Sequence, residues 1–237
     1  MLRSESAASS NIENLTASAR AIAEAEALGD TSRRNAALIV SNTEAMNAAV
    51  ALADQLDENA ILAMHAALMR DSDPASAGRW RTEQVWIGGG NFGPRGADYI
   101  APQHSRVPDA ITDLLGFTRR PDVPTLPQIA IAHAQFETIH PFTDGNGRTS
   151  RALAYFVLCA KIGYRLPGLE TIPEQIAANK TPYYDALEAA DRHWKDDVLD
   201  LGDMEALLDT CLAKQLVSAY EDAQNPDASA VQDRKFH

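Results

Sequence analysis

Twelve consecutive residues, 140–151, combine features suited to binding and attacking a phosphate ester. Gly145 and Gly147 permit backbone conformations closed to other residues, so their amides can approach an anion closely. They directly precede an expected helix, whose N-terminus presents unpaired N–H groups and a partial positive charge. The segment therefore predicts an anion site at a loop-to-helix junction.

Charged side chains in the same segment extend this prediction to nucleotide transfer. Arg148 and Arg151 project from one side of the first helical turn, where bound polyphosphate would offset their repulsion from the helix dipole. Asp144 supplies a hard oxygen ligand suited to Mg²⁺ held between protein and phosphates. His140, with an ordinary pKa of about 6.5, can take a proton from an attacking hydroxyl. Phe142 is expected to anchor the loop in the core.

The segment resembles the Fic domain signature, HPFx(D/E)GNGRxxR, at every specified position. The resemblance covers approximately residues 56–194. It implies an all-α fold, a Fic-type helical bundle with a small β-hairpin flap. Most proteins with this signature transfer AMP from ATP to a Ser, Thr or Tyr hydroxyl of a target protein and release pyrophosphate.

The resemblance also implies a role for each matching residue. His140 would be the general base and Asp144 would hold Mg²⁺. Asn146 and the loop amides would stabilise charge on the α-phosphate, while Arg148 would contact the remaining phosphates and Arg151 the γ-phosphate. The second loop glycine argues against the Doc-type relatives, which phosphorylate instead. The nucleotide-binding set is then Gly145, Asn146, Gly147, Arg148 and Arg151.

A second resemblance concerns regulation. Ser9, Glu13 and Asn14 fit the inhibitory motif (S/T)xxxE(G/N) of self-restrained Fic proteins. In those proteins a short helix places the glutamate against the second arginine of the signature and displaces the γ-phosphate. The alternative is an ordinary helix start capped by Ser9 or Ser10.

A β-hairpin is expected before the signature. Residues 83–87 have the composition of a strand, a glycine-rich turn follows, and residues 97–100 return beside it. In the Fic resemblance this hairpin is the flap, which docks a target segment by strand addition. The flap residues expected to meet the target are Gln84, Val85, Trp86 and Ile87.

Weaker patterns are discounted. Gly88, Gly90 and Gly93 have the spacing of a dinucleotide motif, but no helix follows them. His133 and Glu137 could form a metal set with the histidine of the signature, but Pro141 biases that histidine out of the helix. We expect His133 to orient neighbouring groups instead.

Apolar periodicity predicts a mostly helical chain. The run 148–163 is apolar almost all round, which is typical of a central buried helix. Asp57 is expected to cap the helix before the hairpin, and His65 to be packed and hydrogen-bonded within it. Helices are expected approximately over 12–28, 32–56, 61–69, 108–117, 128–139, 148–163, 183–199 and 204–222.

Composition sets outer limits on function. A net charge of -12 argues against a general nucleic-acid binder. The chain lacks a signal-peptide pattern and an apolar run long enough to span a membrane, so we expect a cytoplasmic protein with free thiols at Cys159 and Cys211. Three parts are expected: an N-terminal helical region with the inhibitory motif at 1–55, a Fic core at 56–200, and a C-terminal helix with a disordered tail at 201–237.

These patterns together predict a protein adenylyltransferase that uses ATP and Mg²⁺, modifies a target protein and itself, and is inhibited through Glu13. Removal of AMP at the same site stays open, because a glutamate beside the phosphates could orient a water. A catalytically quiet Fic-fold interaction module is the alternative from another class. Self-association and transfer of other phosphate-linked groups also stay open.

Overall fold

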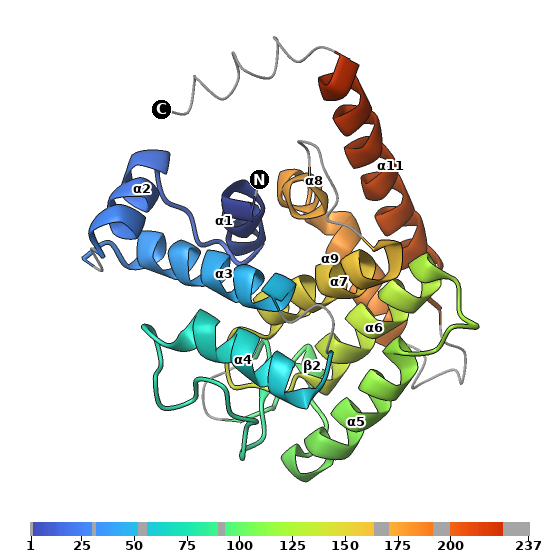
Figure 1. Cartoon of the computed structure of the whole chain (residues 1–237). Coiled ribbons are helices and arrows are strands. Elements are labelled where there is room, and N and C mark those ends of the chain that lie inside the picture. Colours follow the sequence, from blue (N-terminus) through green and yellow to red (C-terminus); the bar gives the residue numbers. More distant parts are fainter. Residues whose placement is uncertain are drawn as a thin grey trace.

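The computed structural model describes residues 2–29, 32–51, 56–89, 93–163, 171–191 and 200–224. It confirms the expected fold class, a helical bundle with one small antiparallel hairpin (Figure 1). The helices are α1 (Leu2–Ile12), α2 (Ala19–Leu28), α3 (Arg34–Ala51), α4 (Glu58–Met69), α5 (Val107–Thr118), α6 (Thr125–Ile139), α7 (Asn146–Ile162), α8 (Ile172–Ala178), α9 (Thr181–Asp191) and α11 (Gly202–Gln224). The strands are β1 (Trp86–Ile87) and β2 (Tyr99–Ile100), and a short 3-10 turn spans His104–Arg106.

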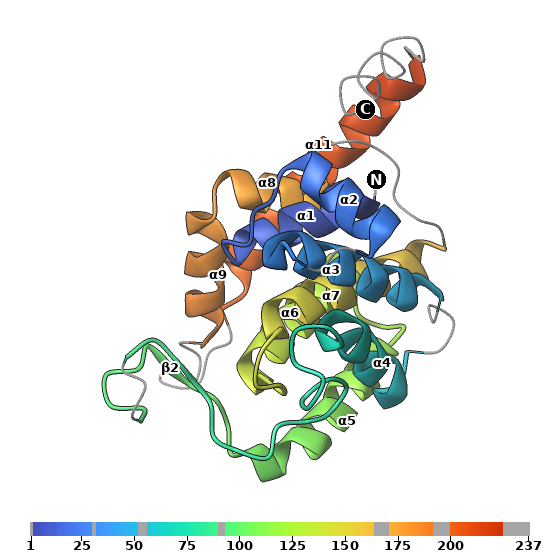
Figure 2. The same ribbon diagram turned by 90° about the vertical axis from the view of Figure 1, so that its left-hand side faces the viewer.

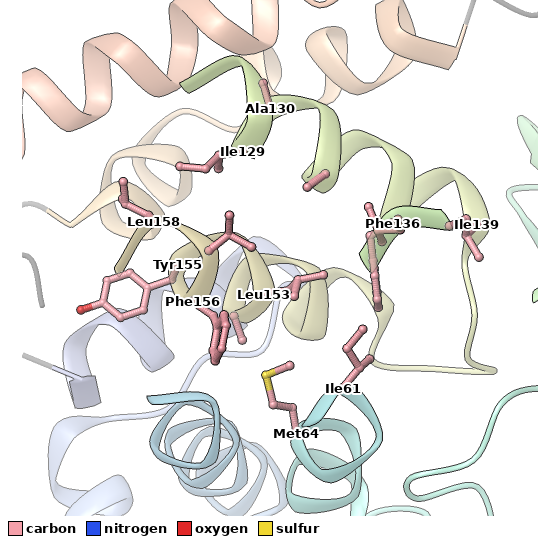
Figure 3. Packing of buried hydrophobic residues seen from close by; sticks show 14 of the residues in the cluster. Ile61, Met64, Ile129, Ala130, Phe136, Ile139, Leu153, Tyr155, Phe156 and Leu158 are labelled. Carbon is pink, nitrogen blue, oxygen red and sulfur yellow. The ribbon is translucent and has the colours of Figure 1, made fainter. Parts of the chain in front are cut away.

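Helix α7 lies at the centre of the bundle, as its apolar sequence predicts. Its side chains pack against α6 on one side and α4 on the other (Figure 3). Phe156 is 1% exposed, and burying such a ring stabilises the fold by ~1.5–3 kcal/mol. Because one loop joins α6 to α7, the C-terminus of α6 and the N-terminus of α7 meet at one end of this central pair.

The first helix differs from the prediction. The sequence places a helix start at 12, whereas α1 ends there and α2 begins only at Ala19, after the cap Ser18. The chain turns because Asn14 adopts a left-handed conformation with φ of 60°, and the Leu15 N–H donates to the Ser10 carbonyl oxygen at 3.0 Å. The motif residue Ser9 therefore lies in the last turns of a helix rather than at its start.

Other boundaries follow local signals. Asp57 caps α4 as expected, with its side chain accepting from the Ala60 N–H at 2.8 Å. Helix α8 is missing from the prediction, although Thr171 and Glu174 form a capping box at its start. The expected helix over 183–199 is described only to Asp191, and the expected tail and Gly90 lie outside the described residues.

The hairpin extends away from the helical body (Figure 2). Trp86 pairs with Ile100 and Ile87 with Tyr99. The strand is shorter than the predicted 83–87, because ladder pairing starts only at Trp86. Within the described ranges, no helix combines the length and apolar character needed to cross a membrane, and Cys159 and Cys211 are free thiols.

Candidate active site

The loop between α6 and α7 is anchored by an aromatic stack. Phe142 is fully buried, and its ring stacks on His65 with centroids 3.6 Å apart and on Trp80 at 4.9 Å. His65 comes from α4 and Trp80 from the segment after it, so two distant parts of the chain hold the loop. The expected anchoring role of Phe142 is consistent with this packing.

His65 also fixes the loop through hydrogen bonds. Its Nδ1 accepts from the Gly78 N–H at 3.0 Å, so in the neutral ring the proton is on Nε2, which donates to the Asp144 carbonyl oxygen at 3.1 Å. Burial lowers the pKa of His65 to about 4, which keeps the ring neutral near pH 7. The prediction that His65 is packed and hydrogen-bonded is confirmed.

Asn146 braces the same loop from inside. Its Oδ1 accepts from the Phe142 N–H at 2.9 Å, and its Nδ2 donates to the Phe142 carbonyl oxygen at 2.9 Å. The residue is only 2% exposed. In this structure the amide therefore shapes the loop, and its predicted contact with the α-phosphate stays a prediction.

His140 stands at the C-terminus of α6 in a left-handed conformation, with φ of 47°. Pro141 disfavours a helical residue before it, as the sequence predicts. The His140 Nδ1 lies 3.3 Å from the Glu137 carbonyl oxygen, so this nitrogen carries the proton in the neutral ring and Nε2 keeps a lone pair. Burial lowers the pKa of His140, which favours that neutral, proton-accepting form.

Arg81 is a site residue that the sequence analysis missed. Its side chain donates to the carbonyl oxygens of His140 at 2.8 Å, Pro102 at 2.6 Å and Glu83 at 2.8 Å. The residue is 3% exposed. It therefore ties the base of the hairpin to the loop that carries the histidine, and no local sequence pattern marks it.

The N-terminus of α7 lies where the sequence predicts an anion site, and its geometry is compatible with that prediction. Gly145 caps the helix with φ of 77°, and the first helical bond runs from the Thr149 N–H to the Gly145 carbonyl oxygen at 3.0 Å. The N–H groups of the preceding three residues have no intrahelical acceptor. Among the described residues, Arg148 Nε and Nη1 are buried with no hydrogen-bond partner. Buried cationic donors without an acceptor, beside a helix N-terminus, fit the phosphates of a nucleotide.

The Glu13 carboxylate lies beside the N-terminus of α7. Its Oε1 lies 2.8 Å from Arg151 Nη2, and a Cβ atom added to Gly147 would lie 2.3 Å from the same oxygen. The Ser9 hydroxyl and carbonyl oxygens accept from Arg151 Nε and Nη2, each at 2.9 Å. The fold thus brings the two separated motifs of the sequence into contact.

The Asp144 side chain lies at the surface of the protein. Its side chain is 71% exposed, with Oδ1 3.8 Å from Arg148 Nη2 and accepting from the Gly145 N–H at 2.6 Å. In the described part of the chain, no cluster of three or more acidic, His or Cys side chains could hold a metal. A single carboxylate fits Mg²⁺, which proteins commonly bind through one or two carboxylates, water and substrate phosphates.

The hairpin presents a partly apolar surface near the loop. Gln84 Nε2 donates to the carbonyl oxygens of Ala101 and, at 3.2 Å, of Val85. The Val85 carbonyl also accepts from the Ala101 N–H at 3.2 Å. Ile87 is 48% exposed and Ile100 is 53% exposed. The docking role of Gln84–Ile87 stays a prediction.

Sequence comparison supports a Fic assignment for the central segment. Residues 55–158 match the model of the Fic/DOC family. A relative called protein adenylyltransferase fic-1 from Caenorhabditis elegans is 37% identical over 105 residues, covering 44% of this chain and 20% of the relative. Protein adenylyltransferase Fic from Drosophila willistoni is 34% identical over 130 residues, which cover 55% of this chain and 24% of the relative. The chain therefore spans only about a fifth to a quarter of these relatives.

Solved structures extend the likeness over most of the chain. A Fic family protein from Desulfovibrio desulfuricans G20 has a TM-score of 0.68 and 26% identity, covering 94% of this chain and 66% of that one. A Fic domain containing signalling protein from Bacteroides thetaiotaomicron has a TM-score of 0.70 at 20% identity, covering 91% and 84%. The likeness confirms the Fic-type helical bundle.

Proposed function

We propose that this chain is a protein adenylyltransferase, which transfers AMP from ATP to a Ser, Thr or Tyr hydroxyl of a target protein. The observation that carries the proposal is the pairing of buried, unpartnered Arg148 N–H groups with a neutral His140 across one short loop. The arginine supplies an anion site, and the histidine supplies a base beside it. The adenylyltransferase names of the relatives agree with this chemistry.

The transfer step follows from these positions. His140 Nε2 takes the proton of the incoming hydroxyl. The oxygen of that hydroxyl forms a bond to the α-phosphorus of ATP. The bond between that phosphorus and the bridging oxygen breaks, and pyrophosphate leaves with the electron pair. Arg148 and the N–H groups at the start of α7 stabilise the charge on the phosphates. Asp144 would hold Mg²⁺, which neutralises phosphate charge when bound.

The hairpin is the proposed docking surface for the target. A strand added along Gln84–Ile87 would present its hydroxyl towards the loop through main-chain hydrogen bonds. The partly exposed Ile87 and Ile100 side chains offer apolar contacts there. The same geometry admits a segment of a second copy, which accounts for the proposed self-modification.

Inhibition through Glu13 is part of the proposal. The carboxylate holds Arg151 and lies against Gly147, where the γ-phosphate is expected. Because two anions cannot share that place, bound Glu13 excludes ATP in its productive position. We assign this regulatory role to the region 1–55, the transfer chemistry to a Fic core at 56–200, and neither to the C-terminal region 201–237.

A second candidate reaction at the same site is removal of AMP. It is favoured by the Glu13 carboxylate, which is 39% exposed and stands beside the anion site, where it could orient a water molecule. This reaction requires Glu13, whereas transfer is suppressed by it. The Glu13→Gly variant therefore separates the two.

The test is intact mass spectrometry after incubation with ATP and Mg²⁺. Glu13→Gly should gain AMP on itself and release pyrophosphate, whereas Glu13→Gly combined with His140→Ala should do neither. If modified protein loses AMP only when Glu13 is present, the second reaction is supported. If neither variant binds or consumes ATP, the chain is a quiet interaction module and the proposal is wrong.

A further inference from the structure

Arg151 divides its hydrogen bonds between the N-terminal segment and helix α9. Nε donates to the Ser9 hydroxyl oxygen, and Nη2 donates to the Ser9 carbonyl oxygen and to Glu13 Oε1. Nη1 instead donates to Tyr183 Oη at 3.4 Å. Within the described structure, Tyr183 is thus the hydrogen-bond partner that stays when Ser9 and Glu13 withdraw for a nucleotide.

Tyr183 is the first member of a buried hydrogen-bond chain. Its Oη lies 3.1 Å from His133 Nε2, and His133 Nδ1 lies 2.7 Å from Ser150 Oγ. Ser150 Oγ also lies 3.4 Å from the His133 carbonyl oxygen. The chain therefore links α9, α6 and α7 and returns to the helix that carries Arg151.

The direction of the hydrogen bonds follows from the two ends. A guanidinium can only donate, so Tyr183 accepts from Arg151 and directs its own hydrogen to His133 Nε2. A neutral His133 then carries its proton on Nδ1 and donates it to Ser150 Oγ, whose own hydrogen has the His133 carbonyl oxygen and the Glu137 carboxyl group as acceptors. With the hydrogen bonds in this direction, each donor hydrogen of the Tyr183, His133 and Ser150 side chains has an acceptor.

Burial makes the chain rigid. The three residues are between 0% and 3% exposed, and an unmade hydrogen bond is costly at such depth. Burial, with the nearby Arg151 charge, lowers the pKa of His133 to about 4, so the ring is neutral near pH 7. Burial raises the pKa of Tyr183, which keeps its hydroxyl protonated. Both side chains thus hold the protonation states that the chain requires.

We infer that Tyr183 and His133 are positioning residues, which hold the Arg151 guanidinium in one orientation both before and after Glu13 leaves it. Arg151 then meets the γ-phosphate already oriented, which lowers the cost of binding ATP. This inference rests on the proposed function, because it takes the γ-phosphate as the second partner of Arg151. His133 and Tyr183 touch neither the reacting atoms nor the nucleotide in this role.

The test compares the affinities of ATP and ADP, since ADP lacks the γ-phosphate. Titration calorimetry with Mg²⁺ is performed in the Glu13→Gly, His140→Ala background, in which inhibition and turnover are both removed. Tyr183→Phe keeps the ring and removes the acceptor of Arg151 Nη1. It should weaken ATP binding about three- to tenfold and leave ADP binding unchanged.

Two further variants separate positioning from packing. His133→Asn should weaken ATP binding to a similar extent, and the double variant should lose no more than the larger single loss, because both changes break one chain. Tyr155→Phe is the matched control, since it removes a hydroxyl from another buried tyrosine that makes no hydrogen bond to Arg151. It should leave the ratio of ATP to ADP affinity unchanged.

The outcomes distinguish the inference from the function on which it rests. An ATP preference that survives Tyr183→Phe, or an equal loss for ATP and ADP, overturns the positioning role alone. A background protein that binds ATP no tighter than ADP overturns the γ-phosphate assignment of Arg151, and the inference with it. A loss of affinity confined to ATP in Tyr183→Phe supports both the positioning role and the γ-phosphate assignment of Arg151. This conclusion holds whether or not His133→Asn folds.

Discussion

The Lys180 ammonium group lies against the C-terminus of α1, where Nζ donates to the Ile12 carbonyl oxygen at 3.2 Å. It also donates to the Asn11 carbonyl oxygen and, at 2.9 Å, to Asn14 Oδ1. The Tyr184 hydroxyl donates to the same Ile12 carbonyl at 3.2 Å. A cation at this end of a helix satisfies its last carbonyls and complements its dipole. The residue next to Glu13 is thus held by Tyr184 of α9 and by Lys180, which directly precedes that helix.

Loss of this contact should weaken the proposed inhibition through Glu13. Lys180→Met keeps the aliphatic stem and removes the charge, so α1 should be held less firmly and Glu13 should leave Arg151 more often. We expect self-modification to rise about two- to tenfold above the parent, below the level of Glu13→Gly. Lys214→Met, which changes an exposed lysine of α11, is the control. Self-modification is measured as intact mass after incubation with ATP and Mg²⁺. Equal modification of Lys180→Met and Lys214→Met would contradict the prediction.

Replacement of the proposed base should separate chemistry from binding. His140→Ala in the Glu13→Gly background should slow AMP transfer by ~10²–10⁴-fold, because the hydroxyl keeps its proton. The affinity for ATP should stay within about twofold of that of Glu13→Gly, since the imidazole acts on the incoming hydroxyl and not on the phosphates. His104→Ala, at a histidine in the 3-10 turn, should change neither quantity. Transfer at the parental rate in His140→Ala would remove His140 from the mechanism.

The metal prediction concerns Asp144. In the Glu13→Gly background, Asp144→Ala should make transfer very low at every Mg²⁺ concentration, because the phosphate charge lacks its bridging cation. Asp122→Ala removes another carboxylate, paired with Arg120 at the surface, and should keep the Mg²⁺ dependence. The measurement is initial pyrophosphate release across a Mg²⁺ titration. An unchanged Mg²⁺ response in Asp144→Ala would place the ion elsewhere.

The flap prediction concerns main-chain docking. Val85→Pro removes one N–H from the segment before β1 and disturbs the extended backbone that a target strand would join. It should reduce modification of a target more than binding of ATP. Val85→Thr keeps the β-branched shape and the N–H group, so it should retain both. Equal losses of modification and ATP binding in Val85→Pro would indicate misfolding instead.

A pH prediction follows from Glu137, which faces the Arg151 and Glu13 charges and the Ser150 hydroxyl, with Asp191 nearby on α9. Burial raises the pKa of Glu137 to about 7 from an ordinary value of 4.5. The folded protein therefore keeps a proton that the unfolded chain has lost, so stability falls as pH rises from about 4.5 to 7 and stays reduced above it.

Glu137→Gln should abolish this loss. The variant should exceed the parent in free energy of unfolding by about 1–3 kcal/mol at pH 8, and the two should converge near pH 4. Urea unfolding at a series of pH values measures the difference. Glu221→Gln, at an exposed carboxylate of α11, should follow the parent throughout. If the free energies of unfolding of Glu137→Gln and the parent differ by the same amount at every pH, burial does not raise the pKa of Glu137.

The sequence alone was enough to predict the loop and, to within two residues, the start of α7. Gly145, the helix that follows it and Arg148 act through contacts within a few residues, so their order along the chain is enough to predict an anion site, which stays a prediction. The same holds for Asp57, whose side chain caps α4 three residues on. The central position of α7 follows from an apolar surface that only a buried helix can accommodate.

The tertiary structure decided where the N-terminal segment with Ser9 and Glu13 lies. Ser9 and Ser10 look like the cap of a helix start, because a serine hydroxyl usually satisfies local backbone N–H groups there. Both instead lie within α1, where Ser9 accepts from Arg151 and Ser10 accepts from Asn42 Nδ2 at 3.2 Å. Residues distant in the sequence thus donate to the two serine hydroxyls, in place of the neighbouring backbone N–H groups that a helix cap would use.

The same reason explains Arg81, Lys180 and the partners of His133, which are Tyr183 and Ser150. The sequence marks His133 as a residue that orients its neighbours, but no local pattern marks these partners. Glu13 and Arg151 are separated by 138 positions, and their contact depends on how α1, α7 and α9 pack. Packing is set by apolar surface distributed over the whole bundle and not by any one segment. Short-range chemistry is therefore readable in the sequence, whereas hydrogen bonds across the bundle form only once the fold has placed their partners.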